Sequence, residues 1–460
     1  MKNLIFICVF NNQEYIKLLY LLLESIFIFG NLNENTDILI YTSTPFMNII
    51  KQSHLFNNHI IFHTNDNYNS VDLACKSRLD LFDIPVVENY NKILYLDSDI
   101  LIQNDINPIF DIIDDNKIYA LQDGFIDNPD NLWGNFLFGN EVQDYEDKTA
   151  FCTGVMLFNN CSDIKELFTV IKQDFIARVE LNTFHDQPYI VYNAFKYNLF
   201  NNKKMGNNTI ILNVDNFDKV ELFYDKTILH FAGAPGRHTH KLINMTRFSN
   251  KIKNITIENN IQLAKSFIDE HLLPIIKDSG ELLEGNIFMF HHTTNYTDRF
   301  INKAKNISNM VLNQQIKNVL EIGFNAGFST LLMLLSNPYV KLTCSDLCEH
   351  AYTIPCYLKL KEIFGDRIHL KPGDSTNTLP TLSDTYDLIH IDGGHDDVVA
   401  TSDIINSYHL SKNRTILIMD DYDFPNLHKL WDSYIAKYNL QKLDIYVYDS
   451  PHHDIKFVVK

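Results

Sequence analysis

Two short motifs, each directly after an apolar run, constrain the architecture of this chain most strongly. The first, Leu94–Asp99, ends in Asp-Ser-Asp, and the second, Leu320–Gly327, carries an acidic residue and two glycines. The second motif begins 221 residues after the first ends (320 − 99). A single hydrophobic core rarely grows beyond about 250–300 residues. Two such motifs this far apart in 460 residues therefore predict two separate domains.

The charge of the chain narrows the range of partners. A formal net charge of −18 argues against nucleic acid, which needs a basic surface for its phosphates, and against docking on anionic lipid. It does not exclude nucleoside diphosphates, because a metal ion can supply positive charge locally. We therefore expect no nucleic-acid partner, and the sequence does not specify the oligomeric state.

The cysteines and the first thirty residues indicate the compartment. Seven cysteines occur without a Cys-x-x-Cys pair, which is typical of reduced thiols. Residues 1–10 lack a cleavage site, and Ile16–Phe29 is short for a membrane span and contains Glu24. We expect a cytoplasmic protein with no membrane insertion. Richness in Asn, Ile, Lys and Tyr indicates a low-GC genome; for a viral source the compartment would be the host cytoplasm.

The first half of the chain alternates strand-like and helix-like runs. Leu4–Phe10 is continuously apolar, as in a strand covered on both faces. The β-α-β order predicts a mostly parallel sheet with helices on both faces. Residues 125–150 are polar and predict a loop or lid. The expected elements are a helix over 14–29 and strands over 4–10, 37–41, 60–62, 92–96, 150–159 and 227–231.

A second β-α-β series begins at Lys317. Its expected strands cover 318–322, 341–345, 367–370, 386–391 and 415–419, followed by an antiparallel pair over 442–448 and 454–459. The stretch near 245–262 is polar without a clear period, which is typical of a domain boundary. The expected fold is α/β throughout, with a first domain over 1–250, a helical linker over 251–284 and a second domain over 285–460.

Asp97 and Asp99 form the first candidate site. Residues two apart in a strand project to the same side, so this pair offers two carboxylates to one hard cation that can bridge a diphosphate. Asp-x-Asp alone is weak evidence, and a solvated turn after a strand is then the better explanation. In its context the motif resembles glycosyltransferase family 8, the group containing glycogenin and bacterial lipopolysaccharide galactosyltransferases. The matching segments, over about residues 1–245, are 9–15, 76–79, 152–159, 185–188 and 230–233.

This resemblance implies a nucleotide-sugar-binding (GT-A-like) fold in which Asp97, Asp99 and His230 hold Mn²⁺ on a UDP-sugar. It also implies that a hexose is transferred with retention at the anomeric carbon, without a claim that Asp186 forms a covalent intermediate. In the implied scheme Asp186 and Gln187 position donor hydroxyls or stabilise the cationic sugar. The implied donor-binding residues are Val9, Asn11, Asn12 and Tyr15 at uracil and ribose, Arg78 at phosphate or sugar, and Gly233 and Arg237 near the diphosphate.

Two departures from the family pattern stand out. Cys152 replaces a usual asparagine, which removes one polar contact. The Lys-Pro-Trp that commonly follows Gly233 is absent, so the cationic role passes to Arg237, with Lys241 as a second candidate.

Glu321, Gly323 and Gly327 form the second candidate site, between an apolar strand and an apolar helix. Glycines let the backbone approach a ligand, and a helix N-terminus favours a carboxylate. With Asp346 and Asp374 after the next two strands, the order resembles class I methyltransferases that use S-adenosylmethionine (SAM), over about residues 285–460. The resemblance implies that Glu321 lies near the methionine amine, Asp346 at the ribose and Asp374 at the adenine. A Rossmann dehydrogenase is the competing interpretation.

Further acidic residues follow the fourth and fifth strands of this series. Asp392, Asp420 and Asp421 at adjacent strand ends suit a Mg²⁺ ion. The pattern resembles metal-dependent O-methyltransferases, including those that act on sugars, and implies that the ion holds a sugar diol. His395 then stands where a general base takes the hydroxyl proton, with Asp392 as the alternative base. Solvated strand ends are the competing explanation.

Together the two resemblances predict a bifunctional glycan-building enzyme. It would transfer a hexose from a UDP-sugar to a glycan or protein acceptor and methylate a sugar hydroxyl with SAM. Two alternatives stay open: a self-glycosylating primer like glycogenin, and a single-activity enzyme whose other domain is a binding scaffold.

Overall fold

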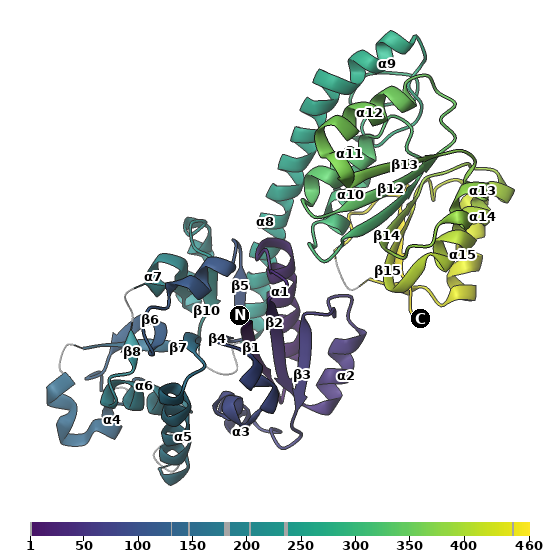
Figure 1. Ribbon diagram of the computed structural model, residues 1–460. Coiled ribbons are helices and arrows are strands. Elements are labelled where there is room, and N and C mark those ends of the chain that lie inside the picture. The colour runs from purple at the N-terminus through teal and green to yellow at the C-terminus, as the bar shows by residue number, and fades with distance from the viewer. Residues whose placement is uncertain are drawn as a thin grey trace. The chain divides into compact units, whose positions relative to one another are not determined.

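The computed structural model describes residues 2–129, 131–145, 148–178, 185–201, 204–233, 238–443 and 446–460. The chain divides into two compact units, unit 1 over Met1–Asn250 and unit 2 over Lys251–Lys460 (Figure 1). The division falls inside the long helix α8 (His238–Phe267), so the polar stretch expected at the domain boundary is helical. A short π-helical segment (Ile268–Leu272) and α9 (Leu273–Ser279) follow α8.

Unit 1 is built on a seven-stranded sheet with the order β3-β2-β1-β4-β7-β6-β8. The first four strands in this order are parallel, whereas β7 runs antiparallel to β4 and β6. The expected mostly parallel arrangement therefore holds for one half of the sheet. The strands are β1 (Asn3–Val9), β2 (Thr36–Thr42), β3 (Ile60–Thr64), β4 (Lys92–Leu96), β6 (Ile118–Phe125), β7 (Thr149–Asn159) and β8 (Phe200–Asn201).

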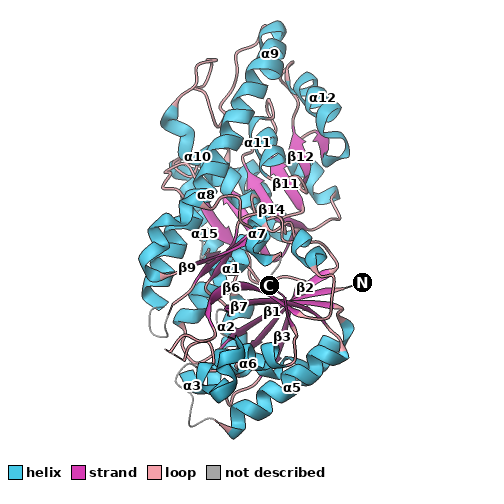
Figure 2. Ribbon diagram, turned by 90° about the vertical axis from the view of Figure 1, so that its left-hand side faces the viewer, coloured by secondary structure: helices cyan, strands magenta, loops and turns pink. Residues whose placement is uncertain are grey.

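Strand β1 shows why this sheet is buried on both faces. Leu4 and Phe6 belong to one apolar cluster, and Ile5 and Ile7 to the other. Successive side chains of a strand point to opposite faces, so a continuous apolar run fits only a strand covered on both sides. Helices cover the strands (Figure 2): α1 (Glu14–Phe29), α2 (Thr44–Gln52), α3 (Val71–Cys75), α4 (Asn135–Phe138), α5 (Ser162–Ala177), α6 (Gln187–Lys196) and α7 (Met205–Asn208).

A small second sheet completes unit 1. It has the order β5-β10-β9, formed by β5 (Ile100–Ile102), β10 (Ile228–Phe231) and β9 (Thr209–Leu212). Strand β5 begins at the residue after the Asp-Ser-Asp motif, and its first residue, Ile100, pairs with His230 of β10. This pairing brings the late histidine beside the early aspartates. The segment expected to be a loop or lid contains α4 and a 3-10 helix over Gly139–Tyr145.

Unit 2 is a second seven-stranded sheet with the order β13-β12-β11-β14-β15-β17-β16. All neighbours are parallel except β17, which is antiparallel to β15 and β16. The expected antiparallel pair at the C-terminus is present, but its first strand covers only two residues. The strands are β11 (Asn318–Ile322), β12 (Lys341–Asp346), β13 (Ile368–Pro372), β14 (Tyr386–Ile391), β15 (Ser411–Met419), β16 (Gln441–Lys442) and β17 (Asp454–Phe457).

Helices lie on both faces of this second sheet. Figure 1 shows α10 (Ile301–Val311), α11 (Phe328–Ser336) and α12 (Thr353–Phe364) on one side, and α13 (Ser375–Thr378), α14 (Asp397–His409) and α15 (Pro425–Tyr438) on the other. Among the described residues, none of the helices combines the length and apolarity needed to cross a membrane.

We predict that Leu417→Ala lowers the free energy of unfolding of unit 2 by about 2–5 kcal/mol, because truncation leaves a cavity in a packed core. Leu417 is buried and shares its apolar cluster with Trp431. The chain has two tryptophans, and Trp133 lies in unit 1. Urea denaturation followed by fluorescence in a Trp133→Phe background therefore reports unit 2 alone. The matched control, Leu94→Ala in β4, should leave the Trp431 transition where it is; an equal shift would show that the units unfold together.

Candidate active sites

The sequence-predicted residues of unit 1 gather around one cavity of about 660 Å³. Its wall lies at the carboxyl ends of β1 and β4, where ligands collect in open α/β sheets. Of the predicted residues, those lining the cavity are Val9, Asn11, Tyr15, Arg78, Asp97, Asp99, Asp186, Gln187, His230 and Gly233. Asn12 is not among them: its Oδ1 accepts a hydrogen bond from the backbone N–H of Glu14 at the start of α1. Arg237 lies outside the described residues.

Asp97, Asp99 and His230 form a compact group of donors in this cavity. Each offers one ligand atom, and these atoms all lie within 4.8 Å of one another. His230 Nε2 is 3.3 Å from an Asp99 oxygen and 4.0 Å from an Asp97 oxygen. Two carboxylates and one imidazole suit Mn²⁺, which accepts oxygen and nitrogen ligands. The residues present therefore fit a divalent ion.

Gly154 leaves the space that this group needs. A Cβ at position 154 would lie 2.3 Å from His230 Cε1 and 2.8 Å from Asp97 Oδ2, so any side chain would displace the ligands. Cys152, two residues earlier on β7, contacts the same histidine, with its Sγ 3.5 Å from His230 Nδ1. The thiol therefore stands against the imidazole and limits its rotation.

Arg78 and Asp186 form a buried ion pair beside this group, with Arg78 Nη1 3.7 Å from Asp97 Oδ1. Two guanidinium nitrogens of Arg78, Nε and Nη2, lie 2.5 and 2.7 Å from the two oxygens of Asp186. Arg78 also donates to the Thr153 carbonyl at 2.8 Å, and Thr153 Oγ1 donates to Gln187 Oε1 at 3.1 Å. Asp186 is thus held by two charge-assisted bonds, and its orientation depends on Arg78.

Lys241 provides positive charge from the first turns of α8. Its Nζ lies 2.5 Å from Asp99 Oδ2 and 3.2 Å from the Gly233 carbonyl oxygen. Burial alone would raise the pKa of Asp99, but Lys241 and His230 outweigh burial and hold that pKa below its ordinary value. Asp99 is therefore ionised and ready to bind a cation at neutral pH.

The predicted residues of unit 2 gather around a second cavity, of about 910 Å³. It lies at the carboxyl ends of the parallel strands β11 to β15, as the β-α-β order predicts. Of the predicted residues, those lining it are Gly323, Asp346, Asp374, Asp392, His395 and Asp421. Glu321, Gly327 and Asp420 lie behind this wall.

The two glycines of the β11–α11 loop are required by the backbone. Gly323 has φ +93°, and a Cβ there would lie 1.9 Å from the Asp392 carbonyl oxygen. Gly327 has φ +77° at the N-cap of α11 and packs against Phe324. Glu321 is fully buried, accepts a hydrogen bond from Thr330 Oγ1 and lies 3.3 Å from His390 Nδ1. Its placement at a methionine amine stays a prediction.

Asp346 and Asp374 are fixed by backbone donors at the cavity wall. Asp346 accepts bonds from the N–H groups of Asn325 at 2.8 Å and Cys348 at 2.7 Å. Asp374 caps α13 by accepting from Thr376 N–H at 2.8 Å. Both carboxylates are thus oriented in advance, with their side chains at the cavity.

Asp392, Asp420 and Asp421 lie together, as their strand-end positions predict, with ligand atoms within 4.8 Å of one another. Lys303 of α10, which no sequence pattern indicated, joins this group. Its Nζ lies 2.7 Å from Asp420 Oδ1 and 3.5 Å from Asp421 Oδ1, and its side chain is 6% exposed. A buried ammonium therefore already pairs with Asp420 and lies near Asp421, and a magnesium ion would have to displace it. With Lys303 in place, the three carboxylates do not fit Mg²⁺. The magnesium site expected from the sequence stays a prediction.

Histidines surround this acidic group. His395 lines the cavity with Nε2 3.0 Å from Asp421 Oδ2, and that hydrogen bond raises the pKa of His395 above its ordinary value. His390 and His453 are buried against Asp420 at 3.3 and 3.4 Å. The alternation of β14 could have indicated that His390 points inward. His453 and Lys303 come from distant elements and carried no sequence signal.

Asp403 of α14 is a buried carboxyl behind the same cavity. Burial raises its pKa from 3.8 to about 6, and the Asp374 and Asp396 carboxylates add to the effect while Ser375 opposes it. Gly393 passes so close that a Cβ there would lie 2.4 Å from Asp403 Oδ2.

Comparisons with known proteins separate the two halves in the same way. Residues 34–235 match the model of "Glycosyl transferase family 8", and residues 320–422 match a model described as "Methyltransferase domain". No curated protein matches the chain.

Solved structures similar to parts of the chain include glycosyltransferases and an O-methyltransferase. The WbbM bifunctional glycosyltransferase matches at 16% identity and TM-score 0.40, covering 53% of this chain and 49% of WbbM, so this chain spans about half of that protein's length. A putative O-methyltransferase from Klebsiella pneumoniae matches at 18% identity and TM-score 0.32, covering 41% and 88%. The glycosyltransferase GlyE from Streptococcus pneumoniae TIGR4 matches at 13% identity and TM-score 0.34, covering 89% and 90%.

We predict that Asp403→Asn raises the free energy of unfolding of unit 2 by about 3 kcal/mol at about pH 7.5 and by about 1 kcal/mol at about pH 4.5. The folded-state pKa lies above the unfolded one, so the wild-type chain loses stability as pH rises from 3.8 through about 6, and the amide abolishes that loss. The urea midpoint of unit 2, followed by Trp431 fluorescence, is measured for both proteins at each pH. The shift caused by the substitution should be larger at the higher pH. The exposed Asp384→Asn should change nothing; a pH-independent effect of Asp403→Asn would contradict the assignment.

Proposed function

Because this chain joins a glycosyltransferase family 8 domain to a methyltransferase domain, we propose that it is a bifunctional glycan-building enzyme. Unit 1 transfers a hexose from a UDP-sugar to a glycan or glycoconjugate, with retention at the anomeric carbon. Unit 2 transfers a methyl group from SAM to a sugar hydroxyl. One observation carries the proposal: each unit holds one large cavity at its strand ends, and the acidic groups of the two cavities differ in donor chemistry.

The donor end of unit 1 supports a UDP-sugar. Tyr15 and Asn11 line the cavity beyond β1 and would hold uracil and ribose. Asp97, Asp99 and His230 would hold a manganese ion, which when bound withdraws charge from a diphosphate and makes it a better leaving group. Lys241, beside Asp99, adds a second cation at the place where negative charge develops.

The part of the cavity wall that carries Asp186 and Gln187 supports positioning of the sugar. Arg78 bonds both oxygens of Asp186, so this carboxylate keeps a fixed orientation at the cavity wall. Gln187 is fixed through Thr153. We assign both to binding donor hydroxyls and stabilising positive charge on the sugar ring as the UDP departs. For retention, the acceptor hydroxyl attacks from the face that the UDP leaves, and the departing phosphate takes its proton.

The cavity of unit 2 supports SAM. Gly323 brings the backbone close to the ligand, Asp346 would bond the ribose hydroxyls and Asp374 would accept from the adenine amino group. Both carboxylates are already oriented by backbone N–H groups, so little ordering is lost when SAM binds.

His395 and Lys303 support transfer to a hydroxyl. His395 is held by Asp421 and would take the proton of the attacking hydroxyl, with Asp392 as the alternative base. Burial and the Asp420 carboxylate raise the pKa of Asp392 well above its ordinary value, as a carboxyl base requires. The Lys303 ammonium stabilises the alkoxide as it forms, a role that a magnesium ion would otherwise take. The fusion itself favours a methyl acceptor that carries the sugar just added.

We predict that UDP release from one UDP-sugar, in the presence of Mn²⁺ and an acceptor, falls at least a hundredfold in Gly154→Ala, because the new methyl group displaces two ligands. UDP release is measured with a panel of donors. The matched control is Gly206→Ala, where the nearest atom to the new Cβ is 3.5 Å away, and it should keep full activity.

Intact mass of the chain after the reaction separates transfer to another molecule from self-glycosylation. Equal UDP release by both glycine variants would contradict the assignment of the ion site. Hexose that accumulates on the chain itself would favour the primer-like alternative.

We predict that two variants of unit 2 separate SAM binding from methyl transfer. Asp346→Ala should weaken SAM binding by about ten- to a hundredfold, because a charged hydrogen bond is lost. His395→Ala should keep SAM affinity and lower the methyl-transfer rate by about 10²–10⁴. Calorimetry and radiolabelled SAM, with the purified glycosylated product as acceptor, measure the two effects. Rates insensitive to EDTA would assign charge neutralisation to Lys303; loss of SAM affinity in His395→Ala would contradict its role as a base.

A further inference from the structure

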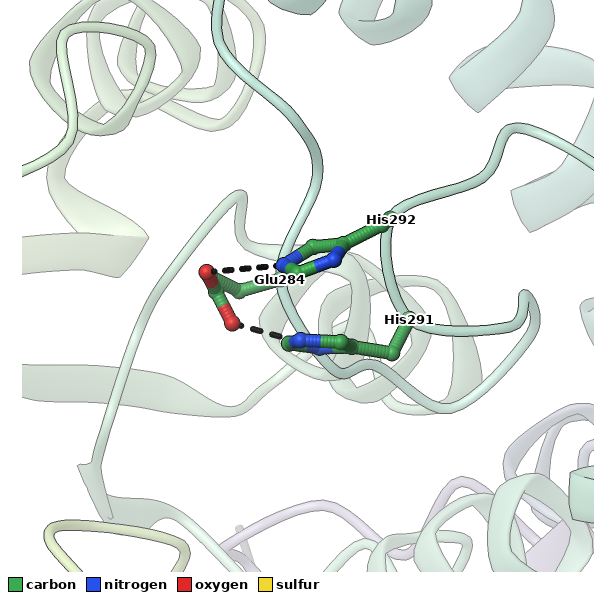
Figure 3. A group of neighbouring side chains, drawn as sticks. All are labelled: Glu284, His291 and His292. Atoms are coloured by element: carbon green, nitrogen blue, oxygen red, sulfur yellow. Dashed lines mark ion pairs between the residues drawn. The ribbon is translucent and has the colours of Figure 1, made fainter.

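Glu284, His291 and His292 form a group of metal-binding side chains outside the acidic sites described above. Figure 3 shows both imidazole rings directed at the two oxygens of one carboxylate. His291 Nδ1 lies 3.2 Å from Glu284 Oε2, and His292 Nε2 lies 3.5 Å from Glu284 Oε1. The ligand atoms of all three residues lie within 4.8 Å of one another. Neither histidine has a role in the proposed reactions.

The backbone places two consecutive histidines on the same side. Neighbouring residues of an extended chain point in opposite directions. Here His292 adopts a left-handed conformation with φ +62°, which is uncommon for a residue with a side chain. Its N–H donates to the Leu283 carbonyl at 2.7 Å, and Thr293 N–H donates to Phe290 O at 3.0 Å. These bonds hold the turn beside Glu284.

The two imidazole rings lie against each other. Their centroids are 3.6 Å apart, with an angle of 34° between the planes. The pair therefore offers two ring nitrogens on the side of the turn that faces Glu284. Two imidazoles and one carboxylate are a donor set that suits a divalent ion of the zinc class.

The spacing of the donors also suits a zinc-like ion. Zn–N and Zn–O bonds of about 2.0–2.2 Å place neighbouring ligands of a tetrahedral ion about 3.3–3.5 Å apart. The two nitrogen–oxygen distances here, each to a different oxygen of Glu284, are 3.2 and 3.5 Å. The side chains are partly exposed, between 37% and 54%, so water can complete the coordination. The other group with two histidines, His390, Asp420 and His453, is fully buried and already pairs with Lys303.

We propose that Glu284, His291 and His292 form a binding site for a zinc-class divalent ion, with two imidazoles, one carboxylate and water as ligands. Glu284 and His291 also line the 910 Å³ cavity, together with Gly285, Met289 and Phe290 of the same segment. The ion fastens the two ends of residues 284–292 to each other and fixes that wall of the cavity. The effect of the ion on cofactor binding rests on the proposed methyl transfer, whereas the ion site itself does not.

Zinc titration of the metal-free full chain by calorimetry, without SAM, tests the site. We expect His291→Ala/His292→Ala to bind one zinc ion fewer per chain than the wild type. The ion site of unit 1 is intact in both proteins and cancels in the difference. His428→Ala is the matched control. His428 is a half-exposed histidine that lies 3.3 Å from Asp432 and, among the described residues, has no second histidine beside that carboxylate. It should bind as much zinc as the wild type.

Equal zinc stoichiometry and affinity in the double variant and the wild type would overturn the proposal, as would an equal loss in His428→Ala. A visible spectrum with Co²⁺ adds a second readout, since loss of two nitrogen ligands should remove the bands of one tetrahedral ion.

The cofactor effect has its own measurement. S-adenosylhomocysteine should bind the wild type more tightly with zinc than without, and the double variant equally in both conditions. Absence of S-adenosylhomocysteine binding in every protein would count against the proposed methyltransferase activity, while the zinc stoichiometry would still decide the ion site.

Discussion

Carboxylates withdrawn from water at the two cavities place the strongest demand on both units, because a buried charge is stable only beside a compensating charge or hydrogen bonds. Each unit meets this demand with cations from a different part of the chain. Arg78 clamps Asp186, Lys241 bonds Asp99, and Lys303 bonds Asp420. The cations come from segments far from the acids in sequence, so each pair also fastens the wall of a cavity. Removing one partner would leave the other charge buried and unpaired.

The two sheets make these encounters possible. Parallel strands direct their carboxyl ends to one edge, so acidic residues that follow separate strands meet there. In unit 1 the antiparallel pairing of β5 with β10 adds His230 to the aspartates of the preceding turn. In unit 2 the neighbouring strands β14 and β15 bring Asp392 beside Asp420 and Asp421. The same topology yields two different acidic groups, one of two aspartates and a histidine and one of three aspartates beside Lys303.

Much of this organisation could be predicted from the sequence. The apolar runs correctly predicted strands β1, β4, β11 and β14, and the predicted α/β fold of both units is confirmed. The family models confirm the family 8 and methyltransferase resemblances. Most candidate residues line one of the two cavities. The site assignments themselves stay predictions. Asn12 does not line the cavity, and its Oδ1 accepts a hydrogen bond from the backbone N–H of Glu14.

The sequence by itself determined what depends on local pattern: two α/β units, the strand-end acids, and the glycines that let the backbone turn at Gly323 and Gly327. The tertiary structure decided which charges meet. Lys303, His390 and His453 reach Asp420 from elements that pack together only in the folded unit, and no spacing in the sequence records that distance. The tertiary structure likewise decided the contact of the two histidines with Glu284. Two consecutive histidines alone are typical of a solvent-exposed segment, and only the left-handed turn at His292 directs both rings at one carboxylate.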